Sequence, residues 1–159
     1  MDAPDDVLTA QEIAEIRQEL AHYPNQSAAS IEALKVIQKH RGWVPDASLK
    51  AVAALLDMSP EALDSVATFY NLIFRRPVGR TVILCCNSVS CWMLGADLVG
   101  EKLSEHLGIG FGQTSPDGAY TLLPIVCLGA CDHAPVVMVG ERLHHDVAPD
   151  TVAALLAEA

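Results

Sequence analysis

The spacing of hydrophobic and polar residues in the first half of the chain is typical of short amphipathic helices. Thr9 and Glu12 stand three positions apart, as in a capping box, and predict a helix that runs to about Tyr23. Three further helices are predicted over these ranges: Ser27 to about Gly42, Pro45 to Leu56, and 60–72 behind the cap Ser59-Pro60. Four short helices in succession predict an N-terminal four-helix bundle.

The pattern changes after Pro77 and Gly79, which form a turn signal. TVILCC reads as a buried strand, and residues 91–107 have helical spacing that Gly108 closes. The strands AYTLLPIV, VVMV and RLHHD follow, and then a last helix opened by Pro149. This β-α-β-β-β-α order fits a thioredoxin-like layered sheet. We therefore expect an α/β protein with a helical bundle over 1–77 and a thioredoxin-like domain over 78–159.

Charge and composition narrow the classes of partner. The chain carries a formal net charge of −10, so binding to nucleic acid or to an anionic membrane surface is not expected. The start MDAPDDVLTAQE lacks the basic and apolar regions of a secretory signal, and no apolar stretch approaches the roughly 20 residues of a membrane span. We expect a soluble, cytosolic chain, in which five cysteines are metal ligands or reactive thiols rather than disulfides.

Four of the cysteines form two closely spaced pairs. Cys86 and Cys91 are separated by four residues, and Cys127 and Cys131 by three. Four thiolates are the ligand set of a [2Fe–2S] cluster or of a tetrahedral zinc ion, and spacings longer than a C-x2-C knuckle favour the cluster. Zinc and redox-active thiols remain alternatives at this point. Both intervening loops are small or polar, and Gly129 is expected to serve as a turn residue whose neighbouring amides point at sulfur.

Cys85 and Cys86 are adjacent in a predicted strand, so their side chains point to opposite faces. Cys86 stands at the mouth of the loop that leads to Cys91. Cys85 continues the apolar strand and is interpreted as a small buried hydrophobic residue. We expect Cys85→Ser to retain a cluster and Cys86→Ser to lose it.

The remaining candidates are interpreted as structural. GIGFGQ at 108–113 lacks the strand, helix and acidic residue of a dinucleotide fingerprint and is expected to be a loop. His133 could replace a cysteine as a ligand, but four thiolates already complete the set, so it is expected to be a donor outside the ligand set or a plain loop residue; His144-His145 is expected to be a solvated pair. Core packing is preferred for four apolar or aromatic side chains, Tyr70, Phe74, Trp92 and Met93. The alternatives are a partner-facing position for the first two and shielding of a cluster from water for the last two. For Arg75 and Arg76, an exposed turn and a partner contact remain equal alternatives.

Several separate segments resemble one family. ASIEALKVIQKHRGWVP, VATFYNLIFRRPVGR, the C-x4-C pair, DGAYTLLP and CLGACDHAP are similar to the small [2Fe–2S] subunit of NADH:quinone oxidoreductase, respiratory complex I. The resemblance extends from about His22 to the last helix. It implies that Cys86, Cys91, Cys127 and Cys131 are the ligands of one [2Fe–2S] cluster, and it assigns nothing to Cys85.

The resemblance also implies a role. In this family the small subunit packs against a flavoprotein subunit that binds FMN and NADH, within the peripheral arm of complex I and its other subunits, and its cluster exchanges an electron with the flavin. This chain would then have no catalytic residue of its own and would lie on the cytoplasmic side of the inner membrane through the complex. Two alternatives remain: the homologous subunit of an NAD-linked formate dehydrogenase or NAD-reducing hydrogenase, and a zinc-bearing structural module.

Overall fold

The computed structural model describes residues 7–157, in two compact units that meet in the sequence at Pro77 and Val78. The acidic residues 1–6, on which the expectation of no secretory signal rests, lie outside the described residues. Among residues 7–157, no helix combines the length and the apolar character that crossing a membrane demands.

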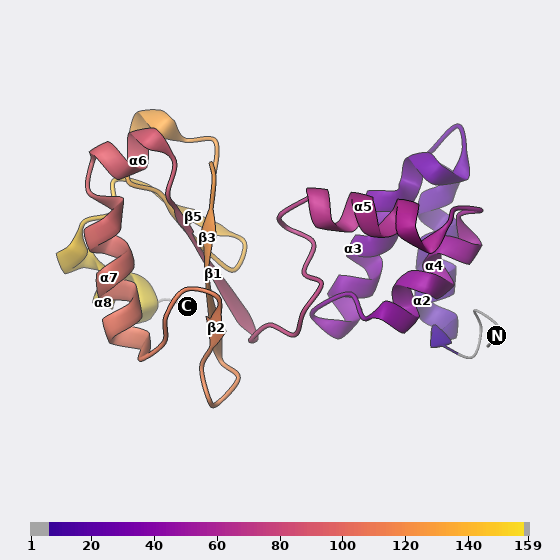
Figure 1. Ribbon diagram of the computed structural model, residues 1–159, viewed down its shortest axis with the longest axis horizontal. Helices are drawn as coiled ribbons and strands as arrows, with labels where there is room; N and C mark the ends of the chain where they lie inside the picture. The colour runs from indigo at the N-terminus through magenta and orange to yellow at the C-terminus, as the bar shows by residue number, and fades with distance from the viewer. Residues whose placement is uncertain (1–6, 158–159) are drawn as a thin grey trace. The chain divides into compact units, whose positions relative to one another are not determined.

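The first unit consists of helices packed on one core (Figure 1). Its elements are α2 (Ala10–Leu20), the 3-10 turn η1 (Gln26–Ala29), α3 (Ser30–Arg41), α4 (Asp46–Leu55) and α5 (Pro60–Phe69). The predicted Thr9–Glu12 capping box is present, and Ser59 caps α5 through the amide of Ala62. Gly42 ends α3 with a φ of 78°, a left-handed conformation that glycine adopts without strain.

A buried ion pair joins two of these helices. Glu12, 1% exposed, accepts hydrogen bonds from Nε and Nη2 of Arg41 at 2.6 and 2.7 Å. The same guanidinium donates to the carbonyl of Val7. The hydrogen bond from Arg41, followed by those from Thr9, lowers the pKa of Glu12 to about 2 against the opposing effect of burial. The start of α2 is therefore fixed to the end of α3.

Two residues at the end of this unit differ from the sequence-based interpretation. The prediction for Tyr70 was wrong, because this side chain is 43% exposed and stacks edge-on with Phe69, which is 80% exposed. Arg75 is not a simple turn residue, because its guanidinium pairs with Asp64 at 2.8 Å and with Asp46 at 2.7 Å. Arg75 lies in the segment that ends the helical unit, and its two ion pairs fix this segment to α4 and α5.

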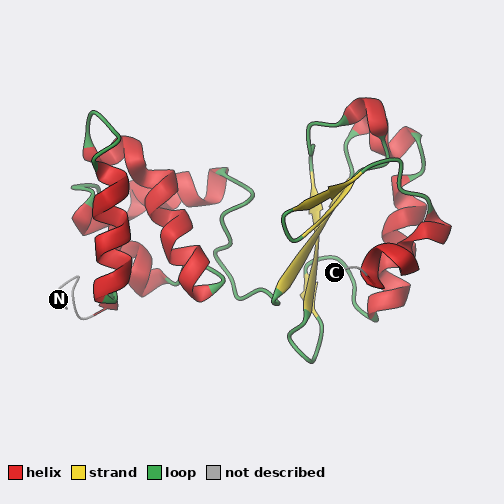
Figure 2. Ribbon diagram, turned by 180° about the vertical axis from the view of Figure 1, so that it is seen from behind, coloured by secondary structure: helices red, strands yellow, loops and turns green. Residues whose placement is uncertain are grey.

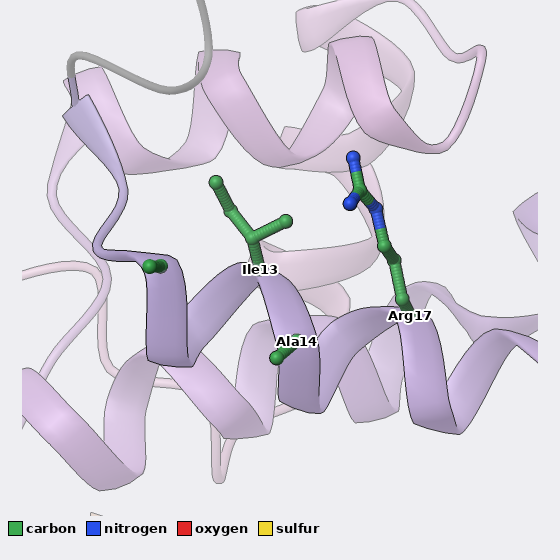
Figure 3. Close-up of a pocket in the computed structure, with 4 residues that line it drawn as sticks. Ile13, Ala14 and Arg17 are labelled. Atoms are coloured by element: carbon green, nitrogen blue, oxygen red, sulfur yellow. The ribbon is translucent and has the colours of Figure 1, made fainter.

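A shallow pocket of about 310 Å³ lies along α2, lined by Ala10, Ile13, Ala14 and Arg17 (Figure 3). Ile13 and Arg17 project from the same side of the helix. The lining contains no sulfur, carboxylate or imidazole, and the cysteines all belong to the other unit.

The second unit is a sheet with helices on one side (Figures 1 and 2). Its strands are β1 (Thr81–Cys86), β2 (Gln113–Thr114), β3 (Tyr120–Ile125), β4 (Val137–Val139) and β5 (Arg142–His144), in the order β2-β3-β1-β4-β5. β1 and β3 are parallel and the other neighbours are antiparallel. The predicted strand–helix–strand unit, hairpin and closing helix are confirmed. The two-residue β2 was missed because both of its residues are exposed and polar.

The single helix predicted over 91–107 is two helices, α6 (Val89–Met93) and α7 (Ala96–Leu107). The break falls at Gly95, whose φ of 92° ends one helical path and starts another. The last helix begins as the turn η3 (Pro149–Thr151) and continues as α8 (Val152–Ala157). α7 and α8 pack on the same face of the sheet as Ile83, Cys85 and Leu122.

Candidate metal centre

The two cysteine loops follow the carboxyl ends of the neighbouring strands β1 and β3. β1 ends at Cys86, which is paired in register with Ile125 at the end of β3. Because the two strands are parallel neighbours, the loops that follow them begin side by side. Cys91 lies on α6 and Cys131 opens the 3-10 turn η2 (Cys131–His133). Strand pairing therefore brings together two loops that are far apart in the sequence.

The four candidate thiols are free and lie in two pairs. Sγ of Cys127 is 3.6 Å from Sγ of Cys131, and Cys86 and Cys91 are buried in the same cluster, where Cys86 raises the pKa of Cys91. The Cys86 thiol also donates to the carbonyl of Val126 at 3.6 Å, which ties the first pair to the second loop. Two thiolates bound to one tetrahedral ion at about 2.3 Å lie about 3.8 Å apart, so the Cys127–Cys131 spacing suits a shared ion.

Among residues 7–157, no three histidine, cysteine or acidic side chains are arranged around one point as a single metal ion requires. A two-iron cluster makes a different demand, because each iron takes two protein ligands and sulfide supplies the rest of its tetrahedron. Two pairs of thiols, one from each loop, match that demand in number and in chemistry. The donor set therefore fits a [2Fe–2S] cluster better than a single zinc ion.

Crowding of the sulfurs disfavours charge on them. Burial, the hydrogen bond with Cys86 and the negative charges of Cys86 and Cys131 raise the pKa of Cys91 to about 11. The hydrogen bond with Cys127 raises the pKa of Cys131. Ionised thiols this close together repel one another. A cationic iron centre would offset this repulsion, and its binding would displace the thiol protons.

Hydrogen-bond donors surround the sulfurs. The amide of Gly129 donates to Sγ of Cys127 at 3.3 Å, and Gly129 has a φ of 84°, so it is both a turn residue and a donor as expected. Contact with the backbone of Val136 lowers the pKa of Cys91, and contact with the side chain of Ser90 lowers the pKa of Cys131. Such donors stabilise the negative charge of a reduced cluster. Val136 and Ser90 were missed, since nothing in their local sequence places them against a sulfur.

Cys85 and Cys86 occupy opposite faces of β1, as predicted. Cys85 is 3% exposed and packs with Val99 and Leu103 behind the sheet, whereas Cys86 packs with Cys91. Burial, followed by the charges of the neighbouring cysteines and Asp97, raises the pKa of Cys85 to about 12. Cys85 is therefore a neutral core residue, turned away from the candidate ligands.

Large apolar side chains are exposed on the first loop and its helix. Trp92 and Met93, which were expected in the core, are 59% and 73% exposed, and Val126 on the neighbouring loop is 70% exposed. Cys127 and Cys131 are exposed as well, whereas Cys86 and Cys91 are buried. We call Val89, Trp92, Met93, Leu94 and Val126 the apolar rim. Exposed apolar side chains that lie together are typical of contact surfaces in proteins.

The other candidates have structural partners. In GIGFGQ, the amide of Gly110 donates to Gln113 and the amide of Gly112 donates to Leu122, so these amides do not face outward to hold a phosphate. Nδ1 of His133 lies 3.1 Å from Oδ2 of Asp146, and the ring of His133 stacks on that of His145. β5, which carries His144, is an edge strand as predicted.

Comparison with known proteins finds a family and relatives that match most of the chain. The thioredoxin-like [2Fe–2S] ferredoxin family matches residues 16–159. A subunit of the NADH-quinone oxidoreductase of Pseudomonas aeruginosa is 49% identical over 150 residues, covering 94% of this chain and 90% of that protein. The corresponding NADH-quinone oxidoreductase subunit from Escherichia coli (strain K12) is 46% identical over 149 residues, with the same coverage.

Among solved structures, an NAD+-reducing [NiFe]-hydrogenase in the air-oxidized state matches 82% of this chain with a TM-score of 0.68. The sequences are 21% identical, and this chain corresponds to 22% of that hydrogenase chain, so the match supports the fold alone.

Proposed function

The chain belongs to the thioredoxin-like [2Fe–2S] ferredoxin family, and from that membership we propose that it is the small electron-carrying subunit of an NADH:quinone oxidoreductase. The identity of 46 to 49% with subunits of that enzyme over almost the whole chain supports this assignment. When bound, a [2Fe–2S] cluster supplies storage for one electron. No bond-making substrate site is proposed for this chain.

We propose Cys86, Cys91, Cys127 and Cys131 as the four ligands. The observation that carries this proposal is the convergence of two thiol pairs at the carboxyl ends of β1 and β3. The amide of Gly129 and the buried position of the first pair favour a charged cluster that is partly shielded from water.

We propose that the partner is the subunit that binds FMN and NADH, and that it docks on the apolar rim. Docking there would cover the exposed pair, Cys127 and Cys131, and would exclude water from the path of the electron. In the assembled complex the chain would lie on the cytoplasmic side of the membrane. We further propose that residues 1–77 act as a helical bundle and 78–159 as the cluster domain.

The experiment is anaerobic purification of the full chain made with iron available. The proposal predicts equal amounts of iron and acid-labile sulfide, and a visible absorbance that dithionite bleaches. Zinc in place of iron, with no visible absorbance, would instead identify a structural zinc module.

Docking is tested by co-purification with the flavoprotein subunit. Trp92→Asp should weaken capture, because a carboxylate would be buried in an apolar contact. Leu72→Asp is the matched control, since Leu72 is also exposed but belongs to the helical unit. Capture of a molybdenum or nickel subunit in place of quinone reductase subunits would assign the chain to a related NAD-linked complex.

A further inference from the structure

The second cysteine loop is hydrogen-bonded to the segment 145–147. The amide of Asp146 donates to the carbonyl of His133 at 2.8 Å, and the amide of Val147 donates to the carbonyl of Pro135 at 2.9 Å. Oδ2 of Asp146 is 3.1 Å from Nδ1 of His133. The ring of His145 stacks on the ring of His133 with centroids 5.2 Å apart. The amide and carboxylate of Asp146 and the ring of His145 therefore all contact one residue of the loop, His133.

His133 transmits these contacts to the cysteines. It is the last residue of the turn that begins at Cys131, and its amide donates to the carbonyl of Ala130. A displacement of His133 would therefore move Cys131 directly. Asp132, whose carboxylate is 3.6 Å from Nε2 of His133, is the other acidic group against this ring.

The same stretch of chain reaches the first thiol pair. The carbonyl of Val136 accepts a hydrogen bond from the amide of Cys86 at 3.2 Å, and Val136 packs in the same buried cluster as Cys86 and Cys91. Residues 133–136 thus lie between segment 145–147 on one side and the first thiol pair on the other. One short segment is in a position to influence both pairs.

Asp146 adopts an uncommon backbone conformation, with a φ of 49°. Asparagine and aspartate tolerate this left-handed region better than other residues with a Cβ. An alanine at position 146 would strain the backbone of the residue whose amide donates to the carbonyl of His133.

We propose that segment 145–147 positions the second cysteine loop, with Asp146 and His145 acting through His133 to fix Cys131 and to set the reduction potential of the cluster. This inference rests on the proposed cluster site. Asp146 and His145 touch no candidate ligand and are positioning residues. The Asp146 carboxylate also adds negative charge near the site, which disfavours the reduced, more negative cluster.

The test compares Asp146→Ala with Asp146→Asn in the iron-loaded full chain. Asparagine keeps the tolerated backbone conformation and an oxygen acceptor for His133, but it removes the charge. Alanine removes all three. Asp57→Ala is the matched control, because Asp57 is also an exposed aspartate at positive φ, 53°, and it belongs to the helical unit.

Asp146→Ala is expected to lose iron to a chelator about threefold to tenfold faster than the parent chain, as the loss of one hydrogen bond allows. Asp146→Asn is expected to retain iron as the parent does but to show a higher midpoint potential. His145→Ala should broaden the EPR signal of the reduced cluster, and His145→Phe, which keeps a stacking ring, should restore it.

The metal-free chain supplies an independent measurement. Amide hydrogen exchange over residues 129–133 should be faster in Asp146→Ala than in the parent or in Asp57→Ala. The inference is overturned if Asp146→Ala matches Asp57→Ala in exchange, iron loss and potential. If the parent chain takes up no iron, the proposed function fails, while the exchange measurement still decides whether the segment holds the loop.

Discussion

Replacing Cys85 or Cys86 by alanine makes the same chemical change at two adjacent residues of β1. Both side chains are buried, at 3% and 2% exposure, and each packs in an apolar cluster. Removing a buried thiol loses transfer free energy and leaves a small cavity, so each variant should lower the unfolding free energy of the metal-free chain by about 1–2 kcal/mol. The two variants are therefore matched in stability.

Their iron contents should differ. Cys85 faces α7 and α8 and lies away from the candidate ligands, so Cys85→Ala should retain the iron and sulfide of the parent chain. Cys86→Ala should lose most of both, because one of four ligands is missing and the Cys91 sulfur loses its neighbour. Alanine has no side-chain atom that can bind iron, so this substitution removes the ligand completely.

The assay is iron and acid-labile sulfide per chain after anaerobic purification, together with denaturant unfolding of each metal-free variant. If Cys85→Ala loses the cluster while Cys86→Ala keeps it, the assignment of faces along β1 is refuted. Equal loss in both variants with unequal stability would show that folding, not ligation, controls the iron content.

Further predictions concern stability and potential. Glu12→Gln should lower the free energy of unfolding by up to about 3 kcal/mol at neutral pH. The pKa of Glu12 is about 4.5 in the unfolded chain and about 2 in the folded protein, so the ionised carboxylate stabilises the fold fully above about pH 4.5. The difference in stability between variant and parent, measured by circular dichroism, should vanish as the pH falls from about 4.5 towards about 2. Gly79→Ala should destabilise by about 1–3 kcal/mol in thermal unfolding, because its Cβ would lie 2.8 Å from the backbone of Tyr120, whereas Gly110→Ala, with 3.5 Å to its nearest neighbour, should be nearly neutral. Ser90→Ala removes the side-chain contact that lowers the pKa of Cys131, a proposed ligand, and should lower the midpoint potential by about 40 mV, equivalent to about 1 kcal/mol, in a redox titration.

Local sequence signals located most of the elements. The capping box at Thr9, the left-handed Gly42 and the Ser59-Pro60 start each act within one helical turn, so their effects are visible in a short window of sequence. Alternation along TVILCC likewise separated Cys85 from Cys86, because successive residues of a strand point to opposite faces.

Signals that depend on tertiary contacts were missed. Trp92 and Met93 are apolar, and their sequence alone does not reveal that α6 presents them to solvent beside the cysteines. The ion pairs of Arg75 were not visible, because Asp46 and Asp64 are distant from it in sequence. The support of His133 by Asp146 depends on the pairing of β4 with β5, which carries the segment past the cysteine loop.

The most direct measurement of the central claim is low-temperature EPR of the anaerobically purified full chain after reduction with dithionite. The account predicts the signal of one unpaired electron shared by two irons, present in the parent chain and in Cys85→Ala and absent from Cys86→Ala. A parent chain that is EPR-silent, contains no iron and still binds its flavoprotein normally would contradict it.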